Sequence, residues 1–296
     1  DTAVSWTWRK APKFFDVVTY TGDGNSGRTV SHNLGSVPGM IIVKKTNSSE
    51  FWYVAHRSIN ADEVLYLNST SAKATQSAYF NGDRPTDSVF TLGNSSATNG
   101  NGDTYVAYLF AHNDGDGGFG PDGDQDIIKC GSFSTDSSGN ATINLGFEPQ
   151  FVMNKVYDAA DNWTVADNMR GFNAIGDQRL YWNLSNAEAT ATTYRVTSTG
   201  FTVNSGETSK NFIYMAIRRG PLAAPTDATD VFKATAMSSS FLADTGFAVD
   251  LSIDTVRTST GSNFVNDRLR GSGVYMNTDG TTAEQTGGSR KFDSNQ

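Results

Sequence analysis

The stretch His32-Asn33-Leu34-Gly35-Ser36-Val37-Pro38-Gly39-Met40-Ile41-Ile42-Val43-Lys44 decides the fold, because a close variant of it returns later in the chain. The second copy reads Ile143-Asn144-Leu145-Gly146-Phe147-Glu148-Pro149-Gln150-Phe151-Val152-Met153-Asn154-Lys155. Further pieces recur in the same order: 51–55 matches 162–166, 66–68 matches 181–183, and 105–110 matches 212–217. Ordered self-similarity of this kind predicts tandem structural units.

The matches divide the chain into two complete units and one divided unit. The complete units span 14–113 and 126–221, and an acidic, glycine-rich linker at 114–125 joins them. After a second linker at 222–228, an incomplete third unit spans 229–296 and stops before its last two strands. Residues 1–13 resemble a final strand of the repeat, so we expect them to be the last strand of a preceding or partner unit.

Each unit alternates short runs rich in Val, Ile, Phe, Tyr and Thr with turns rich in Gly, Asn, Asp and Ser. Such runs at even spacing are typical of antiparallel β folds. The sequence therefore predicts an all-β protein made of tandem antiparallel β-sandwich or jelly-roll repeats of about 100 residues.

Composition excludes several classes of partner and site. The net charge of −8 repels phosphate backbones, so we expect no nucleic-acid partner. No apolar run is long enough for a spanning helix, so we expect no membrane insertion. A single cysteine, Cys130, rules out a disulfide framework and a cysteine-based zinc site.

Several strings resemble one known family. They are Trp8-Arg9-Lys10-Ala11-Pro12, Phe14-Phe15-Asp16-Val17-Val18, the block at 32–44, and Tyr214-Met215-Ala216-Ile217-Arg218-Arg219-Gly220-Pro221. These strings are similar to uncharacterised repeat domains in tail-associated structural proteins of marine bacteriophages. The resemblance implies a virion component, extracellular when assembled, in a tail fibre or similar appendage. It implies partners among other copies of the chain or other virion proteins, and it brings no catalytic residue.

The acidic linker is the candidate metal site. Its five carboxylates lie on a glycine-rich backbone, and they belong to Asp114, Asp116, Asp122, Asp124 and Asp126. Calcium prefers hard oxygen ligands on a flexible loop, so calcium is the one cofactor that the sequence indicates. The alternative is a solvated spacer that charge repulsion keeps extended.

Trp52 and Trp163 occupy matching places in the two complete units. A flat indole ring can cover the face of a sugar, which makes both residues candidate carbohydrate contacts. The alternative is that both are core aromatics, which supply much of the packing energy of a sandwich.

The sequence predicts no catalytic residue and no enzyme. His32, His56 and His112 are far apart and show no metal-binding spacing, and Cys130 lacks a nucleophile signature. Carboxylate pairs occur, but 31 acidic residues make some pairs inevitable.

These observations lead to one principal hypothesis and two alternatives. The principal one is a structural and adhesive virion protein that binds a host surface glycan through many weak contacts. The first alternative is a carbohydrate-degrading tailspike. The second is a head-to-tail extracellular filament, in which Val4, Trp6 and Trp8 complete the unfinished unit of a neighbouring molecule by strand addition.

Overall fold

The computed structural model describes residues 4–220, 232, 234, 249, 251–255, 261–267, 273–279 and 283–287. These residues form antiparallel sheets with two short helices, which confirms the predicted all-β class. The expected linker at 222–228 and most of the third unit at 229–296 lie outside the described residues. Among the described residues, no helix is long and apolar enough to cross a membrane.

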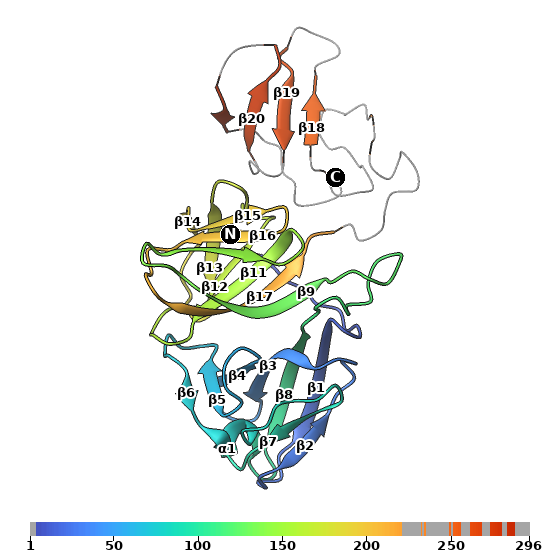
Figure 1. The fold of residues 1–296 in the computed structure, drawn as a ribbon, viewed down its shortest axis with the longest axis vertical. Coiled ribbons are helices and arrows are strands. Elements are labelled where there is room, and N and C mark those ends of the chain that lie inside the picture. The colour runs from blue at the N-terminus through green and yellow to red at the C-terminus, as the bar shows by residue number, and fades with distance from the viewer. Residues whose placement is uncertain are drawn as a thin grey trace.

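Unit 1 (residues 14–113) pairs a large sheet with a small one (Figure 1). The large sheet has the order β1-β8-β3-β4-β5-β6, and the small sheet pairs β2 with β7. The strands are β1 (Phe15–Thr21), β2 (Arg28–Ser31), β3 (Pro38–Lys45), β4 (Trp52–His56), β5 (Glu63–Tyr66), β6 (Ala74–Thr75), β7 (Val89–Leu92) and β8 (Thr104–Ala111). The helical turns α1 (Ser77–Phe80) and α2 (Ser96–Asn99) flank β7 in the chain.

Unit 2 (residues 126–221, described to 220) also pairs a large sheet with a small one. The large sheet has the order β14-β13-β12-β11-β17-β9, and the small sheet has the order β10-β16-β15. The strands are β9 (Ile128–Ser134), β10 (Asn140–Asn144), β11 (Pro149–Val156), β12 (Thr164–Asp167), β13 (Asp177–Tyr181), β14 (Ala189–Ala191), β15 (Tyr194–Thr197), β16 (Gly200–Asn204) and β17 (Asn211–Arg218).

The two large sheets have the same strand order once β1, β8, β3, β4, β5 and β6 are matched with β9, β17, β11, β12, β13 and β14. Near the C-terminus a third sheet has the order β18-β19-β20-β21, with β18 (Leu251–Asp254), β19 (Phe264–Asp267), β20 (Val274–Asn277) and β21 (Gln285–Thr286). A matching irregularity also marks both units. The register shifts between Pro38 and Met40 in β3, and between Pro149 and Phe151 in β11. Proline cannot donate to a ladder, so both strands begin at the proline and place a bulge beside it.

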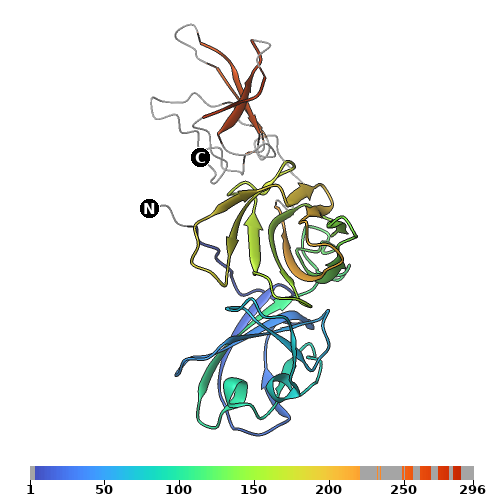
Figure 2. The ribbon, with the colours of Figure 1, turned by 90° about the vertical axis from the view of Figure 1, so that its left-hand side faces the viewer.

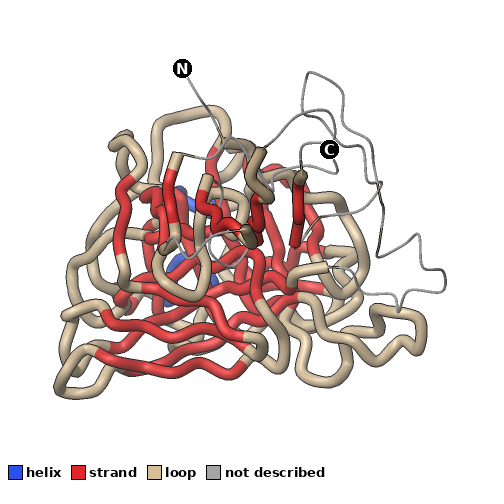
Figure 3. The backbone as a smooth tube through the Cα atoms, turned by 90° about the horizontal axis from the view of Figure 1, so that it is seen from above, coloured by secondary structure: helices blue, strands red, loops and turns tan. Residues whose placement is uncertain are grey.

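Buried side chains form two clusters. One lies inside unit 2, between its large and small sheets. The other is continuous from the interior of unit 1 to the large sheet of unit 2. The two units follow one another along the long axis of the molecule (Figure 2), and strands dominate the backbone in the view from above (Figure 3). The cluster that contains residues of both units therefore joins them into one body.

Candidate functional site: the junction between the units

The junction is an apolar contact between two sheet faces. In each unit the large sheet turns one face toward its own small sheet, and the opposite, outer face meets the other unit. The outer-face side chains of both units belong to one buried cluster, which includes Met40, Ile42 and Val54 of unit 1 and Phe151, Met153, Trp163, Val165 and Ile213 of unit 2. Full burial of each large apolar side chain contributes roughly 1.5–3 kcal/mol. The linker is therefore a minor part of the connection.

Polar groups at one side of the junction are bonded across it. The Trp163 side chain is 0% exposed, and its Nε1–H donates to the Tyr66 carbonyl at 2.8 Å. The Asp161 N–H donates to the Thr70 carbonyl at 2.8 Å. The ammonium of the buried Lys155 donates to the same Thr70 carbonyl at 3.3 Å. These bonds satisfy groups that burial would otherwise leave unpaired, which is the condition for keeping them in a core.

His56 lies at the centre of the junction, at the end of β4. Its Nε2–H donates to the Tyr214 carbonyl at 3.1 Å, and its Nδ1 accepts the Ser58 N–H at 3.2 Å. Burial lowers the pKa of His56 to about 3, with repulsion from neighbouring cations adding to the effect. Close by, a Cβ on Gly39 would lie 2.7 Å from the Cβ of Cys130, so the two sheets approach too closely for any larger residue.

The N-terminal arm, residues 4–10, lies against this junction. Residues 4–10 belong to no strand of this chain, and Ala11 forms an isolated bridge with Phe15. The Trp8 ring contacts the rings of Phe15 and Phe110 in unit 1 and of Phe151 and Trp182 in unit 2. The arm therefore contacts both units at once.

Trp6 fixes the arm to unit 2. Its Nε1–H donates to Asp167 Oδ2 at 2.9 Å, and the guanidinium of Arg170 lies 5.2 Å above its ring. Arg170 Nε also donates to Asp167 Oδ2, at 2.6 Å. Trp6 and Trp8, two of the three residues proposed for strand addition, thus have partners within their own chain, while Val4 is half-buried.

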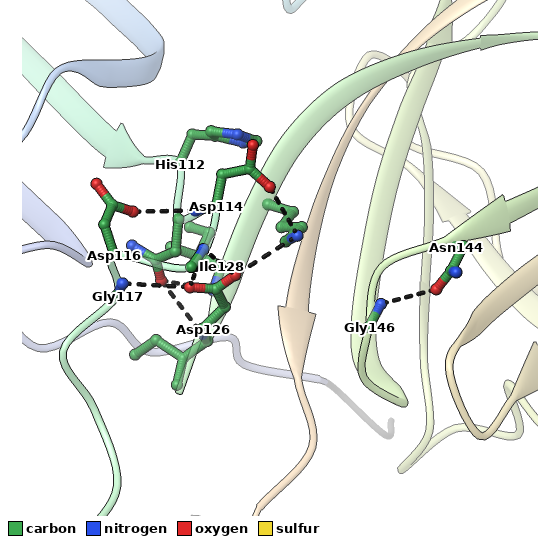
Figure 4. A network of polar contacts seen from close by, with 12 residues as sticks. His112, Asp114, Asp116, Gly117, Asp126, Ile128, Asn144 and Gly146 are labelled. Carbon is green, nitrogen blue, oxygen red and sulfur yellow. Dashed lines mark hydrogen bonds and ion pairs between the residues drawn. The ribbon is translucent and has the colours of Figure 1, made fainter. Parts of the chain in front are cut away.

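The acidic loop does not gather its carboxylates as the calcium prediction requires. Asp126 accepts the backbone N–H groups of Gly115 and Gly117, and Lys129 forms ion pairs with Asp126 and Asp114 (Figure 4). Asp116 accepts the N–H of Asp114, whereas Asp122 and Asp124 are exposed. Across the described residues, no group of three or more acidic, histidine or cysteine side chains is placed to hold a metal ion. Backbone N–H groups and Lys129 therefore contact three of the five carboxylates, those of Asp114, Asp116 and Asp126.

The two matching tryptophans have different surroundings. Trp163 is sealed inside the junction, so it cannot contact a glycan. Trp52 is half-buried, and its ring stacks on Tyr108 with centroids 6.3 Å apart, while Lys44 Nζ lies 5.9 Å from the ring. Of the two predicted carbohydrate contacts, Trp52 alone presents part of its ring to solvent.

The histidines and the cysteine near the junction are in unreactive states. Burial raises the pKa of the Cys130 thiol to about 12, so the thiol is protonated at neutral pH. The Cys130 N–H donates to His112 Nδ1 at 3.2 Å, and burial lowers the pKa of His112. The His112 nitrogen that faces Cys130 is therefore bound to a backbone amide, not to the sulfur.

Four junction residues were not among the predicted site residues: His56, Lys155, Asp167 and Trp182. One available signal was the unbroken apolar run Met40-Ile41-Ile42-Val43, because a strand buried on both faces lacks polar alternation. Nothing in the sequence pointed to Asp167, because unit 1 has His56 at the matching position. The role of Asp167 is to bind Trp6 of the arm, which the repeat pattern does not show.

Comparison with known proteins gives one match. The family described as a domain of unknown function, DUF7483, matches residues 1–221, which include the arm and both units. No curated protein and no solved structure matches the chain. With three quarters of its length inside the match, the chain belongs to the DUF7483 family.

Proposed function

We propose that the chain is a structural and adhesive module of a virion appendage such as a tail fibre, built from tandem sandwich-like units. The resemblance of its repeat strings to tail-associated phage proteins supports this proposal. Its partners are other copies of the chain, other virion proteins and a host surface glycan, and it carries out no reaction.

The observation that carries the proposal is the junction. Domains that share a small polar interface move relative to one another, whereas a large apolar interface holds them rigid. Here Trp163, His56 and the arm residue Trp8 are packed between the units, so a force applied to one unit passes through a core and not through a flexible spacer. Rigidity under load is what a fibre requires.

Repeated weak binding sites on a rigid body gain avidity when several contact a surface together. We therefore place adhesion in many weak contacts and not in one tight site. A head-to-tail filament formed by strand addition is the weaker alternative, because the rings of Trp6 and Trp8 pack on their own chain.

The test uses intact particles. Antibodies raised against the folded chain, imaged by electron microscopy on particles from the source of the gene, are expected to label an appendage at regular intervals. Labelling of soluble host protein instead of particles would overturn the proposal. Incubation of the chain with host polysaccharide tests the tailspike alternative, since rapid release of oligosaccharides requires an enzyme.

A further inference from the structure

Unit 2 has a polar hollow at one end of its sandwich. The hollow has a volume of about 110 Å³ and lies between the large sheet and the start of β15. Its lining includes Asp161, Thr164, Arg179, Tyr181, Tyr194 and Glu207. Thr164 pairs with Tyr181 across β12 and β13, so both point toward the small sheet.

At the matching end of unit 1, aromatic rings stand at the corresponding positions. Tyr53 occupies the place of Thr164, and it pairs with Tyr66 as Thr164 pairs with Tyr181. The ring centroids of Tyr53 and Tyr79 are 4.5 Å apart, and those of Phe51 and Tyr66 are 5.1 Å apart. Unit 1 therefore closes this end with a stack of rings that unit 2 lacks.

The difference extends into the interior. Val43 of unit 1 is fully buried among apolar groups, whereas Asn154 stands at its place in unit 2. The Asn154 side chain is 3% exposed, and its Oδ1 accepts the hydroxyl of Tyr194 at 2.9 Å. Because buried polar groups need a hydrogen-bond partner, Asn154 and Tyr194 form a paired polar arrangement where unit 1 has an apolar side chain. Places where a protein departs from the simpler apolar arrangement are often functional sites.

The side chains around the hollow are held in position. Arg179 Nε donates to Asp177 Oδ2 at 2.9 Å, its Nη2 donates to Thr193 Oγ1, and its guanidinium lies 5.5 Å from the centre of the Tyr194 ring. Because the arginine is already fixed, a ligand would not have to order it, which lowers the entropic cost of binding.

The hollow offers hydrogen-bond donors and acceptors on the same small surface. Arg179 supplies donors, Asp161 and Glu207 supply carboxylate acceptors, and Tyr181 supplies a half-buried ring and a hydroxyl. A strongly anionic ligand would meet two carboxylates, and a cation would meet the guanidinium. A neutral molecule with adjacent hydroxyl groups satisfies both kinds of partner, because each hydroxyl donates and accepts.

We propose that this hollow binds the edge of a neutral sugar residue, and that unit 2 is the glycan-binding unit of the pair. This inference rests on the proposed adhesive function and gives it a location. Unit 1, whose matching end carries aromatic rings, then serves as the support against which unit 2 is packed.

The test is ligand-observed saturation-transfer NMR on the full chain with glucose, galactose, mannose and N-acetylglucosamine. We expect transfer to at least one of these sugars. Thr164→Tyr, which introduces the residue of unit 1, is expected to weaken binding by about tenfold or more. Glu207→Gln, at an exposed position where refolding is not at risk, is expected to weaken it several-fold.

Phe51→Ala is the matched control, because it removes an exposed aromatic side chain of unit 1 and leaves the hollow intact. It is expected to bind as the wild type does. No transfer to any of the four sugars, or equal binding by Thr164→Tyr, Glu207→Gln and the wild type, would overturn the assignment. Loss of binding in Phe51→Ala alone would also overturn this site, while leaving glycan adhesion in place. Particle labelling tests the virion role separately, so the two failures can be told apart.

Discussion

Acid is expected to loosen the junction through His56. The folded chain holds this imidazole neutral, with a pKa lowered by burial from 6.5 to about 3. In the unfolded chain the same group takes up a proton below about pH 6.5. The unfolded state therefore binds more protons than the folded state between these values, and stability falls as the pH drops through that window. Between pH 7 and 5 the loss from this one residue is about 2 kcal/mol.

The assay is urea unfolding followed by tryptophan fluorescence, which suits this chain because all five tryptophans lie within the arm and the two units. The free energy of unfolding is measured at several pH values between 7 and 5, for the wild type and for His56→Gln. The variant keeps a donor for the Tyr214 carbonyl but cannot titrate. We expect the wild type to lose about 2 kcal/mol more than the variant over this range.

The control is His32→Gln, because His32 is also buried with a lowered pKa but contributes nothing to the junction bond with Tyr214. It is expected to keep the part of the pH dependence that comes from His56. Parallel curves for the wild type and His56→Gln would refute the reasoning, since they would mean that His56 does not titrate differently in the two states.

Three further outcomes are expected. Trp8→Ala should lower the free energy of unfolding by about 2–4 kcal/mol in the same assay, because four ring contacts are lost, whereas the exposed Thr7→Ala should change it by under about 0.5 kcal/mol. Gly39→Ala should lower the free energy of unfolding by about 1–3 kcal/mol, because the added carbon overpacks against Cys130. Gly220→Ala should leave it nearly unchanged, because the added carbon there meets nothing within 4 Å. Equal losses in the two variants would contradict the close approach of the sheets. The Cys130 thiol should resist a disulfide reagent at pH 8 in the folded chain and react in urea, and fast labelling of the folded chain would show that it is not sealed.

Much of the strand pattern within each unit could be predicted from the sequence. The matching blocks at 40–44 and 151–155 lie in β3 and β11, and the blocks at 51–55 and 162–166 overlap β4 and β12. The strand prediction succeeded because strands and turns have a local sequence pattern, in which apolar runs alternate with glycine-rich turns in a fixed order.

The contacts between units were beyond the same reasoning. Alternation in the arm shows that one side of Val4, Trp6 and Trp8 is covered, but it does not say by what. A neighbouring strand was expected, whereas the cover is Asp167 and the rings of Phe151 and Trp182. The arrangement of the acidic loop was beyond reach for a related reason: composition shows that five carboxylates are near in sequence, but not that backbone N–H groups and Lys129 contact several of them. Both depend on directions in space that residue types do not encode.

The face-to-face junction limits how such a chain can grow. Ile42 and Val54 of unit 1 stand at the places of Met153 and Val165 in unit 2, so each unit uses the same patch to hold the other. A contact made by like patches closes on itself after two members, as in a two-fold dimer, whereas head-to-tail contacts repeat without end. A third unit of this kind would find the patch already occupied and must attach through a different surface. The pair of units with its arm is therefore the complete structural element, and the single unit is only half of it.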